Sequence, residues 1–401
     1  MRYFIVTYGC QMNKNDSERI AMVLEKKGYK PASKIDETDL IVVNMCSVRQ
    51  SAVDRIFGLS QKFEKLKTKN PKLKTILTGC ILKSDRKKFV KCFDQILSFK
   101  DLLKYQPKYL NNFSAFVPIS NGCNMLCTYC VVPFVRGKLI CRDHKEIIKE
   151  VKNLVKKRFK EIWLLGQNVN DYHSPTNSSV NFPKLLKMVN EIPGNFWIRF
   201  TSPHPSNFSN ELIETMAKSQ KITPYLNLPV QSGDNIILKK MNRPYTAEQY
   251  INLVKEIREK IPGICLSTDI IVGFLDETKK QFENTVKLFK EIKFDMAYIA
   301  KYSPRPGTVA FKLKDNVSPK EKERRYKILT KILKETALEK NKKYIGKEVE
   351  VLVDEIKNGF LIGKTKTYKT VKIQSKENLI GQFIKVKISK ISPFGLRGVI
   401  V

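Results

Sequence analysis

The sequence predicts an α/β fold in three parts: an N-terminal parallel α/β domain, a central incomplete (β/α)6 barrel and a small C-terminal antiparallel β-barrel. Three observations predict it. Strand-like and helical patterns alternate in the first part, six further strand candidates alternate with amphipathic helices, and five short strands follow near the end. We place the domain boundaries at 1–110, 111–337 and 338–401, since 401 residues suffice for two or three domains.

The N-terminal part predicts a parallel sheet, because apolar strand runs at 2–7, 40–43 and 75–78 alternate with helical patterns such as 16–27. A cysteine follows each strand run: Cys10, Cys46 and Cys80. The carboxyl ends of parallel strands share one edge, where open α/β sheets bind ligands. We expect Gly9 and Gly79 to let the backbone bend around a bulky inorganic group. The alternative is three small buried cysteines without a ligand.

A second cysteine set lies in one loop, where Cys123, Cys127 and Cys130 have the spacing C-x3-C-x2-C. Iron–sulfur clusters are normally held by four cysteines, so three local thiolates predict a cubane with one iron open to another ligand. The alternative is half of a structural zinc site. Zinc sites usually add a second C-x2-C pair or histidines, and the sequence has no such second pair.

The central part predicts an open parallel barrel, because its six strand candidates fall short of the eight in a complete one. Residues at the carboxyl ends of these strands are candidates for ligand contact, although they could equally be turn or capping residues. The candidates are Gln167, Ser202, Gln231 and Gly273, and the strand candidates are 116–119, 162–165, 197–201, 226–230, 266–272 and 296–302.

The C-terminal part begins after a Lys-rich helix predicted at 318–343, with Pro319 in its first turn and Gly346 past its end. Its five strand candidates are 348–353, 360–365, 370–373, 383–388 and 398–401. Residues 338–401 contain 14 Lys and Arg against 6 Asp and Glu. Small basic β-barrels often bind RNA. The alternative is a solvated β-domain without a partner.

The charge of the whole chain points to a polyanionic partner, since the formal net charge is +35. The sequence has no apolar run long enough to span a membrane and no signal peptide, so we expect a cytoplasmic protein. Its nine cysteines are then expected to serve metals or catalysis in place of disulfides.

These motifs together resemble the radical S-adenosylmethionine (SAM) methylthiotransferases, and the resemblance covers essentially the whole chain. Among the matching segments are Thr-Tyr-Gly-Cys-Gln-Met-Asn at 7–13, Asn-Met-Cys-Ser-Val-Arg at 44–49, Thr-Gly-Cys at 78–80, the cysteine loop through 134, Arg-Gly at 136–137, Leu-Leu-Gly-Gln-Asn-Val-Asn at 164–170, Arg-Phe-Thr-Ser at 199–202 and Tyr-Ser-Pro-Arg-Pro-Gly-Thr at 302–308. Leu275 and Asp276 depart from the Pro-Gly usual in the family, which puts only a loop in doubt.

The resemblance implies a radical SAM partial barrel, a terminal TRAM domain and two [4Fe-4S] clusters. The loop cysteines would hold the cluster that reduces SAM to a radical, and Cys10, Cys46 and Cys80 would hold an auxiliary cluster that carries sulfur. Contacts to SAM are expected from Tyr129, Gln167, Ser202, Gln231 and Gly273. A second SAM would methylate the sulfur, and no catalytic residue beyond the clusters is implied.

Within the family, segments 11–13, 47–49 and 166–170 resemble the branch acting on isopentenyladenosine in tRNA. The resemblance thus implies 2-methylthiolation of that adenosine at position 37, next to the anticodon. The implied partners are the tRNA anticodon stem-loop, an electron donor such as flavodoxin or ferredoxin, and a sulfur donor. We expect a monomer with no membrane partner. The alternatives are the sister branches that act on threonylcarbamoyladenosine in tRNA or on an aspartate of a ribosomal protein.

Overall fold

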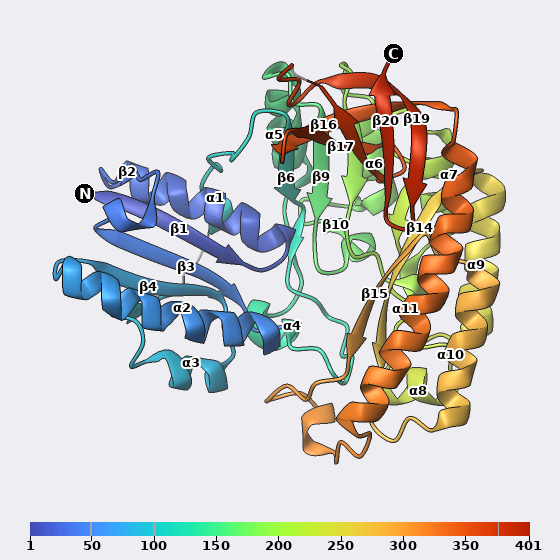
Figure 1. The fold of residues 1–401 in the computed structure, drawn as a ribbon, viewed down its shortest axis with the longest axis horizontal. Coiled ribbons are helices and arrows are strands. Elements are labelled where there is room, and N and C mark those ends of the chain that lie inside the picture. Colours follow the sequence, from blue (N-terminus) through green and yellow to red (C-terminus); the bar gives the residue numbers. More distant parts are fainter. Residues whose placement is uncertain (49, 99–101, 376) are drawn as a thin grey trace. The chain divides into compact units, whose positions relative to one another are not determined.

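The computed structural model describes residues 1–48, 50–98, 102–375 and 377–401 (Figure 1). Arg49, the last residue of one quoted motif, lies outside the described residues. The chain divides into two compact units, each with its own sheets and core. The first comprises Met1–Asn111, Phe116–Ile140 and Ser303–Lys312; the second comprises Asn112–Ala115, Cys141–Tyr302 and Leu313–Val401. The three-domain boundaries expected from the sequence stay a prediction.

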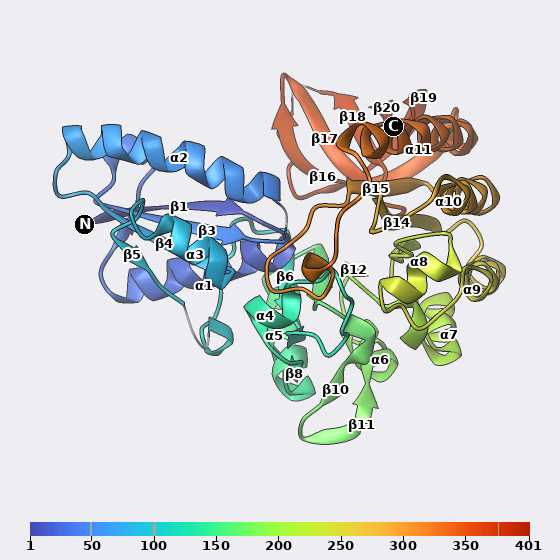
Figure 2. The same cartoon turned by 90° about the horizontal axis from the view of Figure 1, so that it is seen from below.

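The first unit contains a five-stranded parallel sheet in the order β2-β1-β3-β4-β5. Helix α1 covers one face, and α2 and α3 cover the other (Figures 1 and 2). The strands are β1 (Arg2–Tyr8), β2 (Lys30–Pro31), β3 (Leu40–Cys46), β4 (Lys74–Cys80) and β5 (Gln95–Ile96), and the helices are α1 (Gln11–Lys26), α2 (Gln50–Lys69), α3 (Lys83–Phe89) and α4 (Val132–Arg136).

Strand β3 is the centre of this sheet and is buried on both faces. Leu40 and Val42 pack in the cluster that includes α1, whereas Ile41, Val43 and Met45 pack in the cluster that includes α2 and α3. Burial of each such side chain contributes about 1.5–3 kcal/mol, so a slip of one residue would exchange both sets and is strongly disfavoured.

The barrel sheet of the second unit is built from parallel pairs, β9 with β12 and β13 with β14 and then β15. A single parallel bridge between Ile198 and Ile222 links the two groups, so the predicted open barrel is confirmed. The strands are β9 (Glu161–Leu165), β12 (Trp197–Phe200), β13 (Tyr225–Asn227), β14 (Cys265–Val272) and β15 (Met296–Lys301), while β6 (Ser114–Pro118) begins in this unit and ends in the first.

Helices alternate with these strands as the apolar periodicity predicted (Figure 1). They are α5 (His144–Lys156), α6 (Phe182–Asn190), α7 (Asn210–Lys218), α8 (Asn235–Lys240), α9 (Ala247–Lys260) and α10 (Lys279–Ile292), and the short strands β7 (Ser120–Asn121), β8 (Ile140–Cys141), β10 (His173–Ser174) and β11 (Asn177–Asn181) complete the region. No helix among the described residues is long and apolar enough to cross a bilayer.

The long helix α11 (Pro319–Asn341) begins as predicted, with the Ser318 side chain accepting a hydrogen bond from the Glu321 N–H. It leads to a closed barrel of β16 (Glu348–Lys357), β17 (Phe360–Thr365), β18 (Thr370–Gln374), β19 (Phe383–Ser392) and β20 (Gly395–Ile400). The small barrel is confirmed, but β18 and β20 pair in parallel. A closed ring of five strands cannot alternate in direction throughout, so at least one contact must be parallel.

Arg199 of β12 connects this small barrel to the larger one. Its side chain is 2% exposed and donates to the Glu161 carboxylate at 2.6 Å. It also donates to the backbone carbonyls of Thr365, the last residue of β17, and of Lys366 in the turn that follows, each at 2.9 Å. The Tyr368 ring lies 4.9 Å from the guanidinium carbon. A buried arginine with these partners fixes the small barrel on the sheet that carries Arg199.

The same region predicts a pH dependence of stability through Asp354. Burial, followed by repulsion from Glu161, raises the pKa of Asp354 to about 7. Because the folded pKa lies above the unfolded value, the folded state binds the extra proton and stability falls as pH rises through that interval. We expect Asp354→Asn to raise the melting temperature at pH 8 more than at pH 5. Glu348, exposed on the same strand and changed to Gln, is the control, and an equal response of Asp354→Asn at both pH values would contradict the assignment.

Candidate functional site

Cys46 and Cys80 end neighbouring strands and lie directly opposite each other in the sheet register. The strands continue past the apolar runs seen in the sequence, so both cysteines belong to β3 and β4 and do not follow them. A hydrogen bond between the two thiols lowers the pKa of Cys46, and the nearby Arg136 acts in the same direction. The same hydrogen bond raises the pKa of Cys80. The pair is therefore suited to lose one proton, from Cys46, before the Cys80 thiol ionises.

Cys10 reaches the same edge from the next element, because it caps the N-terminus of α1 directly after β1 and Gly9. The Asn13 side-chain oxygen accepts from the Cys10 backbone N–H at 3.3 Å and from the Cys10 thiol at 3.4 Å. The Asn13 amide nitrogen lies 3.8 Å from the Cys80 sulfur. One asparagine thus contacts two of the three thiols.

A reciprocal bond between Asn13 and Asn44 ties helix α1 to strand β3. The Asn13 amide donates to the Asn44 side-chain oxygen at 3.0 Å, and the Asn44 amide donates back to the Asn13 carbonyl at 2.8 Å. Both side chains are fully buried. An unpaired buried polar group costs about 1–3 kcal/mol, so the Asn44 oxygen depends on the donor that Asn13 supplies. The Asn44 nitrogen also donates to the Ser17 hydroxyl at 3.0 Å, and the Asn13 nitrogen to the Met45 carbonyl at 3.2 Å.

The two glycines beside the cysteines make room for this amide pair, and the expectation that they let the backbone bend around an inorganic group stays a prediction. A Cβ on Gly9 would lie 2.3 Å from the Asn13 side-chain oxygen. Gly79 has φ +106°, and its Cβ would lie 2.3 Å from the Met45 carbonyl oxygen and 2.4 Å from the Asn44 side-chain oxygen. Protein packing alone accounts for both glycines.

Arg136, at the end of α4, contacts the Cys80 thiol from outside the sheet. Its Nε lies 3.0 Å from the Cys80 sulfur, and its two terminal nitrogens donate to Asn121 at 3.0 Å and Asp16 at 2.6 Å. Of these residues, sequence reasoning quoted Arg136, Asn13 and Asn44 within motifs but assigned them no role. Their only sequence signal was membership of those motifs.

The loop cysteines Cys123, Cys127 and Cys130 are half-buried in the same unit. Two backbone N–H groups point at their sulfurs, Met125 to Cys123 at 3.4 Å and Val132 to Cys130 at 3.5 Å. Hydrogen bonds of this kind accompany sulfur ligands of iron–sulfur clusters. Tyr129 lies within this loop, partly exposed.

The loop is supported by the segment Ser303–Lys312 of the same unit. The Ala310 N–H donates to the Thr128 carbonyl at 2.9 Å. Arg305 anchors the segment through a buried ion pair with Asp85 at 2.9 Å and a hydrogen bond to Gln50. A part of the chain distant in sequence thereby holds the cysteine loop in shape.

The donor sets are compatible with iron–sulfur clusters. Within the described ranges, no three His, Cys, Asp or Glu side chains are placed to hold a single metal ion. A four-iron cluster is larger than one ion, so the cysteines that bind it lie farther apart than the ligands of a single metal ion. Both sets consist only of cysteines, and each has N–H donors within reach of a sulfur, which suits clusters held by thiolates.

The other candidate residues belong to the second unit and follow its strands. Ser202 after β12 has φ +56° and Gln231 after β13 has φ +73°, a conformation that costs non-glycine residues of order 1–3 kcal/mol and clusters at functional sites. Gln167 lies two residues beyond β9, partly exposed. Contact of these residues with SAM stays a prediction.

Gly273 has a different structural reason. Its φ is +68°, and a Cβ there would lie 2.4 Å from Cγ of Lys322 on α11. Its N–H donates to the Glu277 carboxylate at 2.6 Å, and Glu277 pairs with Arg325 at 2.6 Å. Packing of α11 therefore explains why this position is a glycine. Contact of Gly273 with SAM stays a prediction, and the packing can be explained without it.

Comparison with known families agrees with this architecture. The model of the Radical SAM superfamily matches residues 117–289, Uncharacterized protein family UPF0004 matches residues 2–99, and the TRAM domain matches residues 342–401. The fold is similar to that of a radical S-adenosylmethionine methyltransferase from Kitasatospora setae, with a TM-score of 0.52 at 13% identity over 77% of each chain. The fold and the three-cysteine loop thus define a radical SAM protein.

Two relatives specify the family further. A protein of Clostridium botulinum strain Langeland is 40% identical over 99% of this chain and 96% of its own length. One of Carboxydothermus hydrogenoformans is 39% identical over 100% of this chain and 99% of its own length. Both are named tRNA-2-methylthio-N(6)-dimethylallyladenosine synthase. The chain belongs to this family of methylthiotransferases, which confirms the resemblance seen in the sequence.

The Arg136 contacts predict a stability effect in the metal-free protein. The Arg136 and Asp16 side chains are only 11% and 12% exposed, and removal of one partner from a buried pair costs about 3–5 kcal/mol. We expect Arg136→Ala to lower the free energy of unfolding in urea by about 3 kcal/mol.

Arg2→Ala is the matched control, because its ion pair with Glu37 has side chains 59% and 44% exposed. Exposed pairs contribute about 0–1 kcal/mol. If both variants lose the same small amount, the Arg136 cluster does not stabilise the site.

Proposed function

We propose that the protein converts N6-dimethylallyladenosine (isopentenyladenosine) at position 37 of tRNA, next to the anticodon, to its 2-methylthio derivative. The observation that carries this proposal is the 40% identity with a synthase of that name over nearly the full length of both chains. The six cysteines and the TRAM barrel supply the two features such a reaction needs, sites for redox cofactors and a surface for RNA.

The chain is a radical SAM enzyme, and its family uses SAM and a [4Fe-4S] cluster. We assign that cluster to Cys123, Cys127 and Cys130, and a second [4Fe-4S] cluster to Cys10, Cys46 and Cys80. When bound, these groups supply radical formation and sulfur transfer. The chain's own residues hold them: Arg136 and Asn13 offer N–H donors to the thiols, and the strand register fixes where Cys46 and Cys80 stand.

A strip of cations on the TRAM barrel suits an RNA backbone. Lys372 on β18 lies beside Arg397 on β20, which lies opposite Lys390 on β19. The Phe360 ring is 3.7 Å from the Lys372 amino group, measured to the ring centroid. Like charges in neighbouring strand positions repel, so their grouping favours an anionic partner. Cations beside an aromatic ring are typical of nucleic-acid surfaces.

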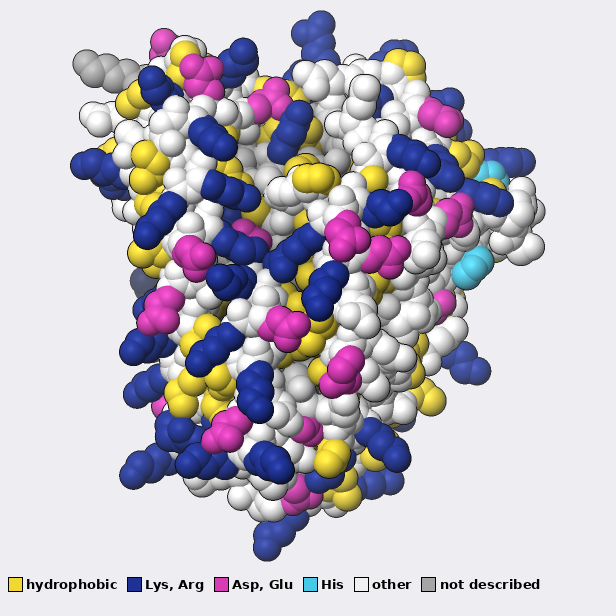
Figure 3. All heavy atoms as spheres, turned by 90° about the vertical axis from the view of Figure 1, so that its right-hand side faces the viewer, with side chains coloured by type: hydrophobic (Ala, Val, Ile, Leu, Met, Phe, Trp, Pro, Cys, Tyr) yellow, Lys and Arg dark blue, Asp and Glu magenta, His cyan; other side chains and the backbone are white. Residues whose placement is uncertain are grey.

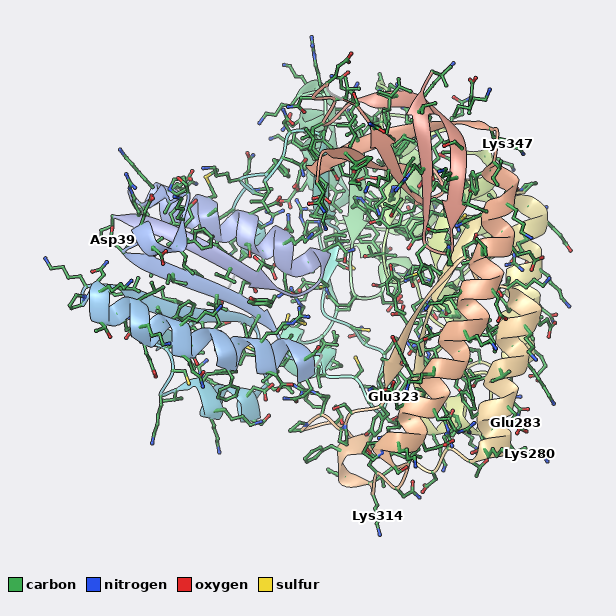
Figure 4. The ribbon with its side chains drawn as sticks, in the orientation of Figure 1. Asp39, Lys280, Glu283, Lys314, Glu323 and Lys347 are labelled. Carbon is green, nitrogen blue, oxygen red and sulfur yellow. The ribbon has the colours of Figure 1, made fainter. Side chains whose placement is uncertain are left out.

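The helical face of the second unit differs from this strip. Figure 3 shows Lys and Arg spread over that face with Asp and Glu between them. Ion pairs join neighbouring elements there, as between Lys301 and Glu323 at 2.8 Å, with Glu323 on α11 labelled in Figure 4. Some cations of the helical face are therefore paired with neighbouring carboxylates, whereas the strip consists of three cations beside an aromatic ring.

The reaction replaces C–H by C–S–CH3, so it consumes a sulfur atom, a methyl group and electrons, and the hydrogen of the broken bond would leave in 5'-deoxyadenosine derived from a second SAM. SAM supplies the methyl group. We propose that flavodoxin or ferredoxin supplies electrons, that a separate donor restores sulfur, and that the enzyme acts as a monomer in the cytoplasm. The expected RNA element is the anticodon stem-loop.

The substrate is tested with synthetic stem-loops carrying dimethylallyladenosine, adenosine or threonylcarbamoyladenosine at position 37, with nucleoside products measured by mass spectrometry. We expect the dimethylallyl stem-loop to react with a kcat/KM roughly 10- to 200-fold above that of adenosine, because an apolar pocket discriminates by about 1–3 kcal/mol. Equal turnover of threonylcarbamoyladenosine would contradict the branch assignment.

The same assay tests the cation strip with Arg397→Glu, which should raise KM for the stem-loop and flatten its salt dependence. Lys152→Glu on the exposed side of α5 makes the same change in net charge and is the control. Equal effects of the two variants would show that the strip attracts the RNA only non-specifically, through net charge.

A further inference from the structure

Asn168 is a buried asparagine without a partner for its side chain. It is 2% exposed, and neither its amide nitrogen nor its amide oxygen has a hydrogen-bond partner in the structure. Most buried polar atoms are hydrogen-bonded, and an unsatisfied one costs about 1–3 kcal/mol. Two orphan atoms on one side chain therefore indicate a partner that binds there.

The backbone around Asn168 is held firmly, so the side chain cannot simply turn to solvent. Asn168 lies beyond the carboxyl end of β9, and Val169 next to it is fully buried. Two residues on, Asn170 accepts from the His204 N–H at 2.8 Å and donates to the His204 carbonyl at 2.9 Å. These bonds tie the loop after β9 to the loop after the neighbouring strand β12.

A third orphan atom lies in the tied loop. The Nε2 atom of His204 is buried without a partner, while Nδ1 lies 2.6 Å from the Ser206 hydroxyl. His204 is 6% exposed, and burial followed by the charge of Arg243 lowers its pKa to about 3. Two adjacent loops at the carboxyl edge thus each present an unpaired polar group, at the edge where parallel barrels bind substrates.

The amide group of Asn168 limits which chemical groups can be its partner. Its oxygen accepts and its nitrogen donates, side by side in one plane. The Hoogsteen edge of adenine offers the complement, N7 as acceptor and N6–H as donor, and asparagine pairs with it in a bidentate manner. A single alkyl group on N6 leaves one N–H for this contact. C2 lies on the opposite side of the ring, so an amide on this edge leaves C2 free to react.

We propose that Asn168 binds the Hoogsteen edge of the adenine that is methylthiolated, a contact that rests on the function proposed above. Asn168 is then a specificity residue that orients the base with C2 away from the amide. SAM carries the same edge on its own adenine, so the test must separate the two sources.

The test uses the holoenzyme and stem-loops with dimethylallyladenosine or its 7-deaza analogue, which lacks N7, at position 37. For the wild type we expect the 7-deaza stem-loop to lose roughly 5- to 150-fold in kcat/KM, the factor for about 1–3 kcal/mol when a buried amide donor is left without its acceptor. Asn168→Leu should lose a similar factor with the normal stem-loop and should not distinguish the two. Reductive cleavage of SAM without RNA should be unchanged in this variant.

Stability separates binding from a structural role. Asn168→Leu removes two orphan polar atoms, so its melting temperature should stay equal or rise. Asn170→Leu is the matched contrast, because it breaks two formed hydrogen bonds and should melt lower. A large drop in melting temperature for Asn168→Leu would overturn the proposal.

Three kinetic outcomes would also overturn it. Equal wild-type turnover of both stem-loops would exclude the N7 contact while the proposed function stands. Loss of SAM cleavage in Asn168→Leu, with the 7-deaza effect retained, would assign the amide to SAM. A wild type that methylthiolates neither stem-loop would contradict the function and this contact with it.

Discussion

The reciprocal bond between Asn13 and Asn44 is the interaction on which the cysteine edge of the first unit depends. It joins helix α1 to strand β3 at the level where the strand ends, and so sets the distance of Cys10 from Cys46 and Cys80. Both amides are fully buried, so loss of the Asn13 side chain would deprive the Asn44 oxygen of its donor, whereas the Asn13 nitrogen would keep its bond to the Met45 carbonyl if Asn44 were lost. The bond thus fixes the position of Cys10 through the packing of α1 on β3.

Buried arginines complete each unit in a similar way. Arg136 neutralises Asp16 and reaches the Cys80 thiol, whereas Arg199 neutralises Glu161 and holds two carbonyls of the TRAM barrel. Arginine suits both places because its planar fork serves several acceptors at once and stays charged when buried. The first places positive charge beside the Cys80 thiol; the second fixes the TRAM barrel to the sheet that contains β12.

Apolar runs and cysteine positions were sufficient to predict the sheets, because buried strands need continuous apolar residues and their carboxyl ends share an edge. The strand ends were less predictable. Asn44 is polar in the sequence, yet it continues β3 because its amide is paired across 31 residues. The parallel contact between β18 and β20 follows from ring closure and not from any local pattern.

Side-chain roles that depend on tertiary contacts could not be read from the sequence. The role of Arg136 requires knowing that α4 lies beside β4, and the reason for Gly273 requires knowing that Lys322 covers it. Asn168 also required the structure, because the lack of hydrogen-bond partners for its side chain is evident only from the residues packed around it. The motifs indicated the positions, and the packing supplied the reasons.

The central claim is that two separate thiolate sets each hold a four-iron cluster. It is tested most directly by the iron content and Mössbauer spectrum of the anaerobically reconstituted protein, compared with a variant in which Cys10, Cys46 and Cys80 are all Ala. The account predicts about eight iron atoms per chain in the wild type and about four in the variant, the counts for two clusters and one. A variant that retains the full iron load, or a wild type that binds only about four, would contradict it.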